Sequence, residues 1–152
     1  MPGMKAPALT FGSDSKLSGD IKSSSDYGGL IYNTILPGVT EGKMSGGFID
    51  GDENYNDPIL NFNKGVGNDD LFLAIHSSEY TYTVSQNEHG DYDIAIMLMD
   101  TFDFTEWGKF EGLSELANKK GIIDQKAGVI NPFDFTAQIS DTASKEVVDS
   151  YR

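Results

Sequence analysis

Two stretches rich in strand-forming residues near the middle of the chain constrain the fold most strongly. Residues 79–85 and residues 92–102 each place one apolar set on a single face of an extended chain, because successive side chains of a strand point to opposite faces. The two sets are Tyr80, Tyr82 and Val84, followed by Tyr92, Ile94, Ile96 and Leu98. Residues 86–91 are polar and contain a glycine. The pattern predicts a long antiparallel hairpin.

The second strand of this hairpin and the residues before the first strand lead to two further expectations. The other face of the second strand is also apolar, at Ala95, Met97 and Met99, so we expect its middle to be buried on both sides. Upstream, the apolar residues occupy odd positions up to Ile75 and even positions from Tyr80. A strand cannot change face without a bulge or a break, which we place at residues 76–78.

The remainder of the chain gives weaker signals. Residues 1–29 have the composition of loops, and we expect them to be loosely ordered. Short apolar runs predict strands at Leu30–Leu36, Phe48–Ile49 and Ile59–Phe62. The C-terminal third predicts a helix over 105–120, a strand over 133–139 and a short helix over 144–151. We therefore expect one domain, residues 1–152, of the α+β class and mainly β. An antiparallel sheet or open half-barrel would carry one or two short helices in the C-terminal third.

Charge and composition exclude several function classes. The chain has 24 acidic and 11 basic residues, a net charge of −13. Residues 51–104 hold eleven of the acidic residues and one lysine. Such a chain repels phosphate backbones and anionic membranes, so we expect no nucleic-acid partner. The longest apolar run, Ile94–Met99, has six residues, whereas a membrane-spanning helix needs about 20. Cysteine is absent, which removes disulfides and thiolate chemistry.

The N-terminal residues Met-Pro-Gly-Met-Lys lack the apolar segment of an ordinary signal peptide. If the protein is exported, we therefore expect a dedicated export system or a carrier domain to do it.

Oxygen-bearing side chains at alternate positions suggest a cation loop at Asp50, Asp52 and Asn54, because Ca²⁺ prefers six to eight oxygen ligands. The EF-hand pattern would need glycine and glutamate where the chain has Tyr55 and Asn61. The alternative is an Asx-rich turn without a metal.

The two histidines differ in context. His89 precedes Gly90 in the predicted hairpin turn, where we expect an exposed side chain. His76 lies at the predicted bulge, a place where side chains are often directed into active sites. His76 is therefore a candidate general acid or base, and its alternative role is packing.

The strongest candidate for chemistry follows the second strand of the hairpin. Asp100 and Asp103 lie three residues apart among aromatic residues. Apolar surroundings and a second carboxylate separate the pKa values of such a pair, which suits general acid–base catalysis. The pair could instead hold a divalent cation, Mg²⁺ or Ca²⁺, for phosphoester chemistry. In a third interpretation Asp103 caps the following helix and Asp100 faces water.

This strand ending resembles the Asp-x-Tyr-Asp motif of colicin M-like bacteriocins, with Phe102 at the tyrosine position. That family cleaves the lipid-linked peptidoglycan precursor lipid II on an open, β-rich half-barrel. The family has His-Arg five residues later, where this chain has Lys109-Phe110. The resemblance therefore implies fold and context but no catalytic base. The ending is also similar to C-terminal toxin domains of bacterial polymorphic toxins and type VI secretion effectors.

Three functions follow as hypotheses. The first is an antibacterial effector with catalytic residues Asp100, Asp103 and His76, which would be paired with a cognate immunity protein. The second is a non-enzymatic or immunity-type protein whose acidic middle third captures a basic partner. The third is an adhesion module with calcium-binding loops.

Overall fold

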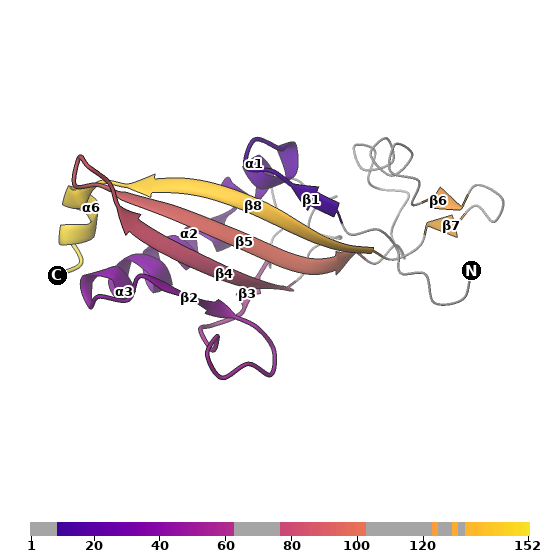
Figure 1. Ribbon diagram of the computed structural model, residues 1–152, viewed down its shortest axis with the longest axis horizontal. Coiled ribbons are helices and arrows are strands. Elements are labelled where there is room, and N and C mark those ends of the chain that lie inside the picture. Colours follow the sequence, from indigo (N-terminus) through magenta and orange to yellow (C-terminus); the bar gives the residue numbers. More distant parts are fainter. Residues whose placement is uncertain (1–8, 63–76, 103–122, 125–128, 131–132) are drawn as a thin grey trace.

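The computed structural model describes residues 9–62, 77–102, 123–124, 129–130 and 133–152 (Figure 1). Its centre is a six-stranded sheet in the order β1-β8-β5-β4-β2, with β3 beside β4 as well. These strands are β1 (Leu9–Phe11), β2 (Ser45–Phe48), β3 (Leu60–Asn61), β4 (Ser77–Gln86), β5 (Tyr92–Phe102) and β8 (Phe133–Ala143). A separate pair consists of β6 (Ile123–Asp124) and β7 (Val129–Ile130). Neighbouring strands of the large sheet are antiparallel except for β1, which runs parallel to β8.

The predicted hairpin and the α+β, mainly β class are confirmed. β4 pairs with β5 from Gln86↔Tyr92 to Glu79↔Met99, so the turn occupies residues 87–91 as predicted. The predicted late strand is present as β8 and continues to Ala143. The short terminal helix is present as α6 (Lys145–Asp149), and Ser144 caps its N-terminus through a hydrogen bond from the Val147 amide. The predicted helix over 105–120 lies outside the described residues.

Most described helices lie in the N-terminal third, so the predicted placement of helices in the C-terminal third is wrong in part. These helices are α1 (Lys16–Lys22), α2 (Ser25–Leu30), the π-helix η1 (Ile31–Ile35) and α3 (Leu36–Thr40). The serines that indicated loops are N-caps, because the Ser15 and Ser24 hydroxyls accept bonds from the amides of Ser18 and Tyr27. The described part of residues 1–29 thus holds a strand and helices where the composition indicated loops.

The apolar run over residues 30–36 is helical and not a strand. α2, η1 and α3 follow one another directly, and Leu36 donates its amide hydrogen bond to the carbonyl of Ile31, five residues back. Pro37, at the start of α3, has no amide hydrogen, and its ring would clash with a carbonyl four residues earlier. The wider π turn immediately before Pro37 lets the helix continue past this residue.

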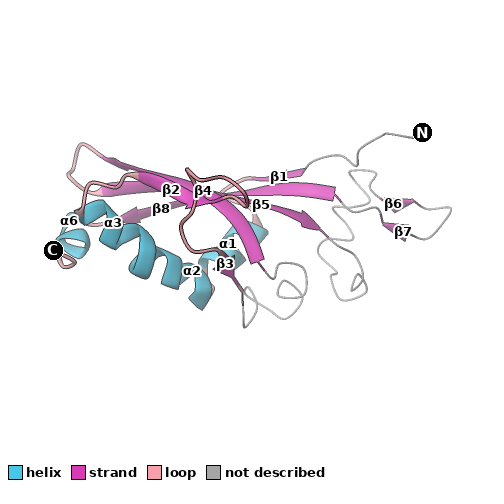
Figure 2. Cartoon of the chain, turned by 90° about the horizontal axis from the view of Figure 1, so that it is seen from below, coloured by secondary structure: helices cyan, strands magenta, loops and turns pink. Residues whose placement is uncertain are grey.

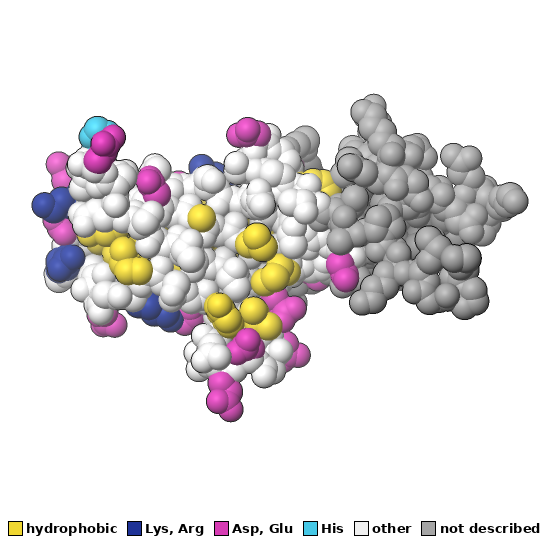
Figure 3. All heavy atoms as spheres, in the orientation of Figure 1, with side chains coloured by type: hydrophobic (Ala, Val, Ile, Leu, Met, Phe, Trp, Pro, Cys, Tyr) yellow, Lys and Arg dark blue, Asp and Glu magenta, His cyan; other side chains and the backbone are white. Residues whose placement is uncertain are grey.

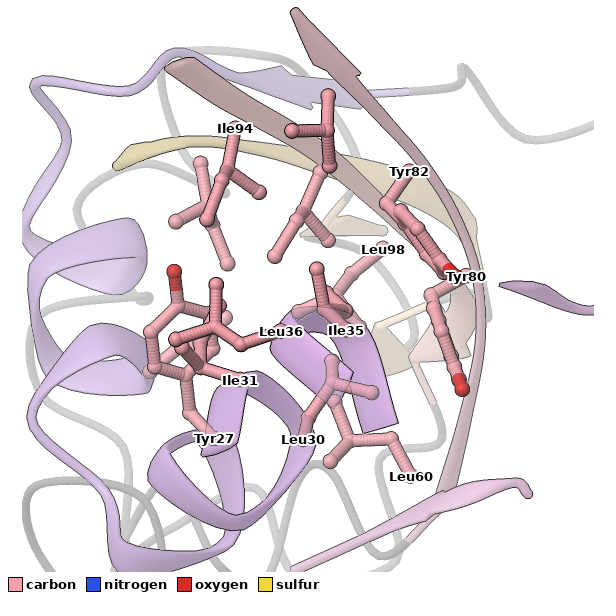
Figure 4. Packing of buried hydrophobic residues seen from close by; sticks show 14 of the residues in the cluster. Tyr27, Leu30, Ile31, Ile35, Leu36, Leu60, Tyr80, Tyr82, Ile94 and Leu98 are labelled. Carbon is pink, nitrogen blue, oxygen red and sulfur yellow. The ribbon is translucent and has the colours of Figure 1, made fainter. Parts of the chain in front are cut away.

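These helices cover a single face of the sheet, and the core lies between the two layers (Figure 2). The buried rows of the sheet come from β4, β5 and β8, and the helices contribute aliphatic residues such as Ile31, Ile35 and Leu36 (Figure 4). The opposite face of the sheet is open. Ala95 is exposed, Met97 is 37% exposed and Met99 is half-buried. The expected burial of β5 on both sides is therefore wrong, because no described element packs on its second face.

The edge of β8 is protected in two different ways. β1 pairs with β8 only over Phe135–Ala137. Beyond this point α1 replaces it, because the Ser18 hydroxyl donates to the Gln138 carbonyl (2.7 Å) and the Lys22 ammonium to the Ser140 carbonyl (3.0 Å). Helix side chains thus satisfy backbone groups that would otherwise be free to pair with another strand. Among the described helices, none is long and apolar enough to cross a membrane.

Candidate functional site

Asp100 lies at the end of β5 and on the face of β5 that carries the core. It follows the buried row ending at Ile96 and Leu98, pairs across the sheet with the buried Phe135, and is itself half-buried. A carboxylate that continues an apolar row is unusual, because a half-buried charge needs compensating contacts, and Asp100 does have an interaction partner. This position is the described part of the predicted catalytic site.

The strand ends around Asp100 lie side by side. Because β4 and β5 are antiparallel and Glu79 pairs with Met99, the start of β4 at Ser77 lies beside the end of β5 at Phe102. Ser78 is buried there, and its hydroxyl donates to the Met99 carbonyl (3.1 Å). β8 begins at this end of the sheet as well, with Phe133 opposite Phe102.

The other two predicted catalytic residues, His76 and Asp103, lie outside the described residues, as does the first position of the predicted bulge. In the sequence, His76 directly precedes β4 and Asp103 directly follows β5. His89 is described. It lies in the hairpin turn at the opposite end of β5 from Asp100, and its side chain is 77% exposed, as expected.

The predicted cation loop has the hydrogen bonds of a turn. The Asp52 carboxylate accepts a bond from the Asn54 amide (2.9 Å), which is an Asx turn. The Asp50 amide donates to the Glu79 carboxylate (2.7 Å). Within the described parts of the chain, no three His, Cys, Asp or Glu side chains are placed to share a metal ion. Calcium binding at Asp50, Asp52 and Asn54 stays a prediction.

One charged cluster was missed by the sequence analysis. The Asp57 carboxylate accepts hydrogen bonds from the Lys43 ammonium (2.5 Å) and from the Gly47 amide (2.9 Å). The buried Tyr82 hydroxyl is next to this pair, and the Lys43 ammonium interacts with it. A Cβ at Gly46 would lie 2.5 Å from the Asp57 carboxylate and 2.9 Å from the Tyr82 hydroxyl, so a larger residue there would displace the side chains of this cluster. The Gly46-Gly47 pair was the available sequence signal.

The ionisation of this cluster favours a structural role. The hydrogen bond to Asp57 raises the pKa of Lys43, and burial raises the pKa of Tyr82. Both groups therefore stay protonated at neutral pH. Protonated Lys43 and neutral Tyr82 do not act as a base or a nucleophile. The hydrogen bonds of the cluster instead hold β2 against Asp57, the residue that follows the loop over residues 49–56.

A second cluster lies at the β8 edge. The Asp141 carboxylate accepts a hydrogen bond from the Tyr27 hydroxyl (2.9 Å) and from the Thr142 amide (2.8 Å), and the Lys22 ammonium lies 3.7 Å away. Burial raises the pKa of Tyr27, and the charge of Asp141 raises it further. Asp141 thus has its bonding capacity filled by α1, α2 and its own strand, which again indicates a structural role.

The chain matches no family model, no curated protein and no solved structure.

Proposed function

We propose that the chain is an antibacterial effector domain whose reactive site lies at the Asp100 end of the sheet. The observation that carries this proposal is the half-buried Asp100 on the core face of β5, beside the paired ends of β4 and β5. His76 and Asp103 adjoin those two strand ends in the sequence. All three predicted catalytic residues are therefore attached to the same end of one hairpin.

The chemistry that suits this end is hydrolysis of a phosphoester. Two aspartates can divide the roles of general acid and general base, or they can hold a divalent cation that stabilises the developing charge. The resemblance to colicin M-like bacteriocins supports a lipid-linked peptidoglycan precursor as the substrate class and the target-cell envelope as the place of action. Secretion through a dedicated system or a carrier, and neutralisation by an immunity protein, belong to the same proposal.

The test directs the chain to the periplasm or the cytoplasm of a susceptible bacterium and follows growth and lysis. We expect lysis on periplasmic expression and normal growth on cytoplasmic expression. Asp100→Asn should abolish the lysis. Glu88→Gln is the matched control, because Glu88 lies in the hairpin turn at the opposite end of β5 from Asp100 and its side chain is exposed. Harmless expression of the wild type in both compartments would refute an antibacterial function.

A second function is favoured by a different observation. The loop that contains residues 49–57 protrudes from the edge of the sheet (Figure 1), and Asp50 and Glu53 on it are exposed. An acidic projection on a chain of charge −13 would speed association with a basic partner. Under this alternative the chain is an immunity-type binding protein. Its association rate with a basic toxin should then fall steeply with salt, and a rate insensitive to salt would exclude the alternative.

A further inference from the structure

The open face of the sheet has a shallow hollow of about 390 Å³ near the hairpin end. Two cross-strand rows from β4, β5 and β8 form its floor. The rows are Thr83–Ala95–Ser140 and Ser85–Asp93–Thr142. All six side chains are short. Ala95, at the centre of the first row, leaves space that a side chain as large as that of Met97 would fill. The volume lies in the range of small-ligand sites, which begins at about 300 Å³.

The floor of the hollow combines hydroxyl groups with one carboxylate. Asp93 stands between Ser85 and Thr142 in its row. Its carboxylate is exposed and accepts a long hydrogen bond from the Asn87 amide group (3.3 Å), and no described basic side chain forms an ion pair with it. A serine or threonine hydroxyl can both donate and accept, so it matches a ligand hydroxyl in either orientation.

Asp93 carries the one charge at the hollow that no neighbouring charge among the described residues compensates. Lys22 also borders the hollow, but its ammonium donates to the Ser140 carbonyl and lies 3.7 Å from the Asp141 carboxylate. These two opposite charges compensate each other, and Asp93 remains. Figure 3 views this open face, and most of its charged side chains lie around the margins of the sheet. The excess of acidic residues in the chain attracts cations and repels anions.

We propose that this hollow binds a hydroxyl-bearing organic cation, such as an amino sugar with a free amine. The ammonium group would lie against Asp93, and the ligand hydroxyls would bond to the serine and threonine side chains of the two rows. The hollow and Asp100 lie on opposite faces of β5 and toward opposite ends of it. This site is therefore separate from the proposed reactive site, and either can fail without the other.

The test titrates ¹⁵N-labelled protein with three probes and follows amide shifts. Glucosamine carries both ammonium and hydroxyl groups, glucose carries only hydroxyls, and ethylammonium carries only the charge. Two variants alter the hollow: Asp93→Asn removes its carboxylate, and Ala95→Leu fills its centre. Glu41→Gln is the matched control, because it removes one exposed acidic charge at the end of α3, in the layer of helices on the other face of the sheet. A variant is folded if its amide spectrum matches that of the wild type away from the substituted residue.

The expected result is saturable shifts at Thr83, Ala95 and Ser140 with glucosamine, at least about fivefold tighter than with glucose or ethylammonium. Asp93→Asn should weaken glucosamine binding about tenfold, as expected for one charge-assisted hydrogen bond. Ala95→Leu should abolish binding, and Glu41→Gln should leave it unchanged. Equal affinity for glucosamine and glucose would overturn the proposal. So would glucosamine binding that Asp93→Asn does not weaken, or shifts confined to another part of the sheet.

Discussion

Gly47 is the residue at which the backbone tolerates the least change. Its φ is +145°, which favours glycine, and a Cβ there would lie 2.1 Å from the Tyr80 carbonyl oxygen. Gly47→Ala should lower the free energy of unfolding by at least about 2 kcal/mol. Gly19→Ala is the control, because Gly19 lies in α1 with open space around it, and alanine should stabilise that helix by up to about 1 kcal/mol. Urea unfolding measures both, and equal effects would contradict this view of β2.

Asp57 should matter for stability although it lies in a loop region. Its carboxylate binds Lys43 with one oxygen and the Gly47 amide with the other. Asn at this position can supply one acceptor oxygen and not two, so Asp57→Asn should cost about 1–3 kcal/mol. Asp52→Asn keeps the single acceptor of its Asx turn and should change stability by less than about 0.5 kcal/mol. Chemical denaturation of the two variants would contradict the account if their losses were equal.

Individual contacts were the part least predictable from the sequence. Lys43 and Asp57 are 14 residues apart, and Tyr27 and Asp141 are 114 apart. Such pairs form only when the strands and helices pack, so no local pattern indicates them. Asp100 was selected as a candidate because it directly follows the apolar run Ile94–Met99, and its role in chemistry stays a prediction. The roles of His76 and Asp103 stay predictions.

Among the elements, the alternating strands were predictable and the N-terminal helices were not. The hairpin has a period of two over long stretches, and β8 continues the same pattern. The run Leu30–Leu36 contains tyrosine, threonine and isoleucines, which favour strands, and Pro37 follows it. Packing of that run against the sheet overrides its local preference, and η1 accommodates the proline. Apolar residues on the second face of β5 indicated burial, but coverage depends on which other elements reach that face.

The edge of β8 gives a prediction about α1. Ser18→Ala together with Lys22→Ala leaves the Gln138 and Ser140 carbonyls without the partners that α1 provides. An uncovered strand edge promotes pairing between molecules. We expect concentration-dependent oligomers by light scattering and a lower melting temperature. Ser23→Ala removes only a hydroxyl bond within α1 and should stay at the wild-type size. A double variant that keeps the wild-type mass at all concentrations would show that α1 does not protect this edge.

At the scale of the whole molecule, buried tyrosines should make stability fall at alkaline pH. Burial raises the pKa of Tyr27, Tyr80 and Tyr82 above the ordinary value of 10.0. The stabilising contribution of these groups is complete below that value. It is lost as pH rises, because the unfolded chain then releases protons that the folded chain retains. Each tyrosine adds at most about 1.4 kcal/mol per pH unit to the decline, between its ordinary pKa and its raised pKa.

Above about pH 10, the free energy of unfolding of Tyr27→Phe should therefore fall less steeply with pH than that of the wild type. The difference in slope is the contribution of one tyrosine. Urea unfolding at a series of pH values measures this slope. The same variant also loses the bond to Asp141, so it should be less stable at neutral pH. An unchanged alkaline slope would show that Tyr27 ionises equally in the folded and unfolded states.

The central claim concerns the whole chain acting at the Asp100 end of the sheet. The most direct measurement incubates the purified chain with a lipid-linked peptidoglycan precursor and detects the released phosphorylated headgroup by mass spectrometry. Wild type and Glu88→Gln should release product at similar rates, whereas Asp100→Asn should lose at least about a hundredfold in rate, as expected for a general acid or base. Release by Asp100→Asn at the rate of Glu88→Gln, in a protein of unchanged melting temperature, would contradict the claim.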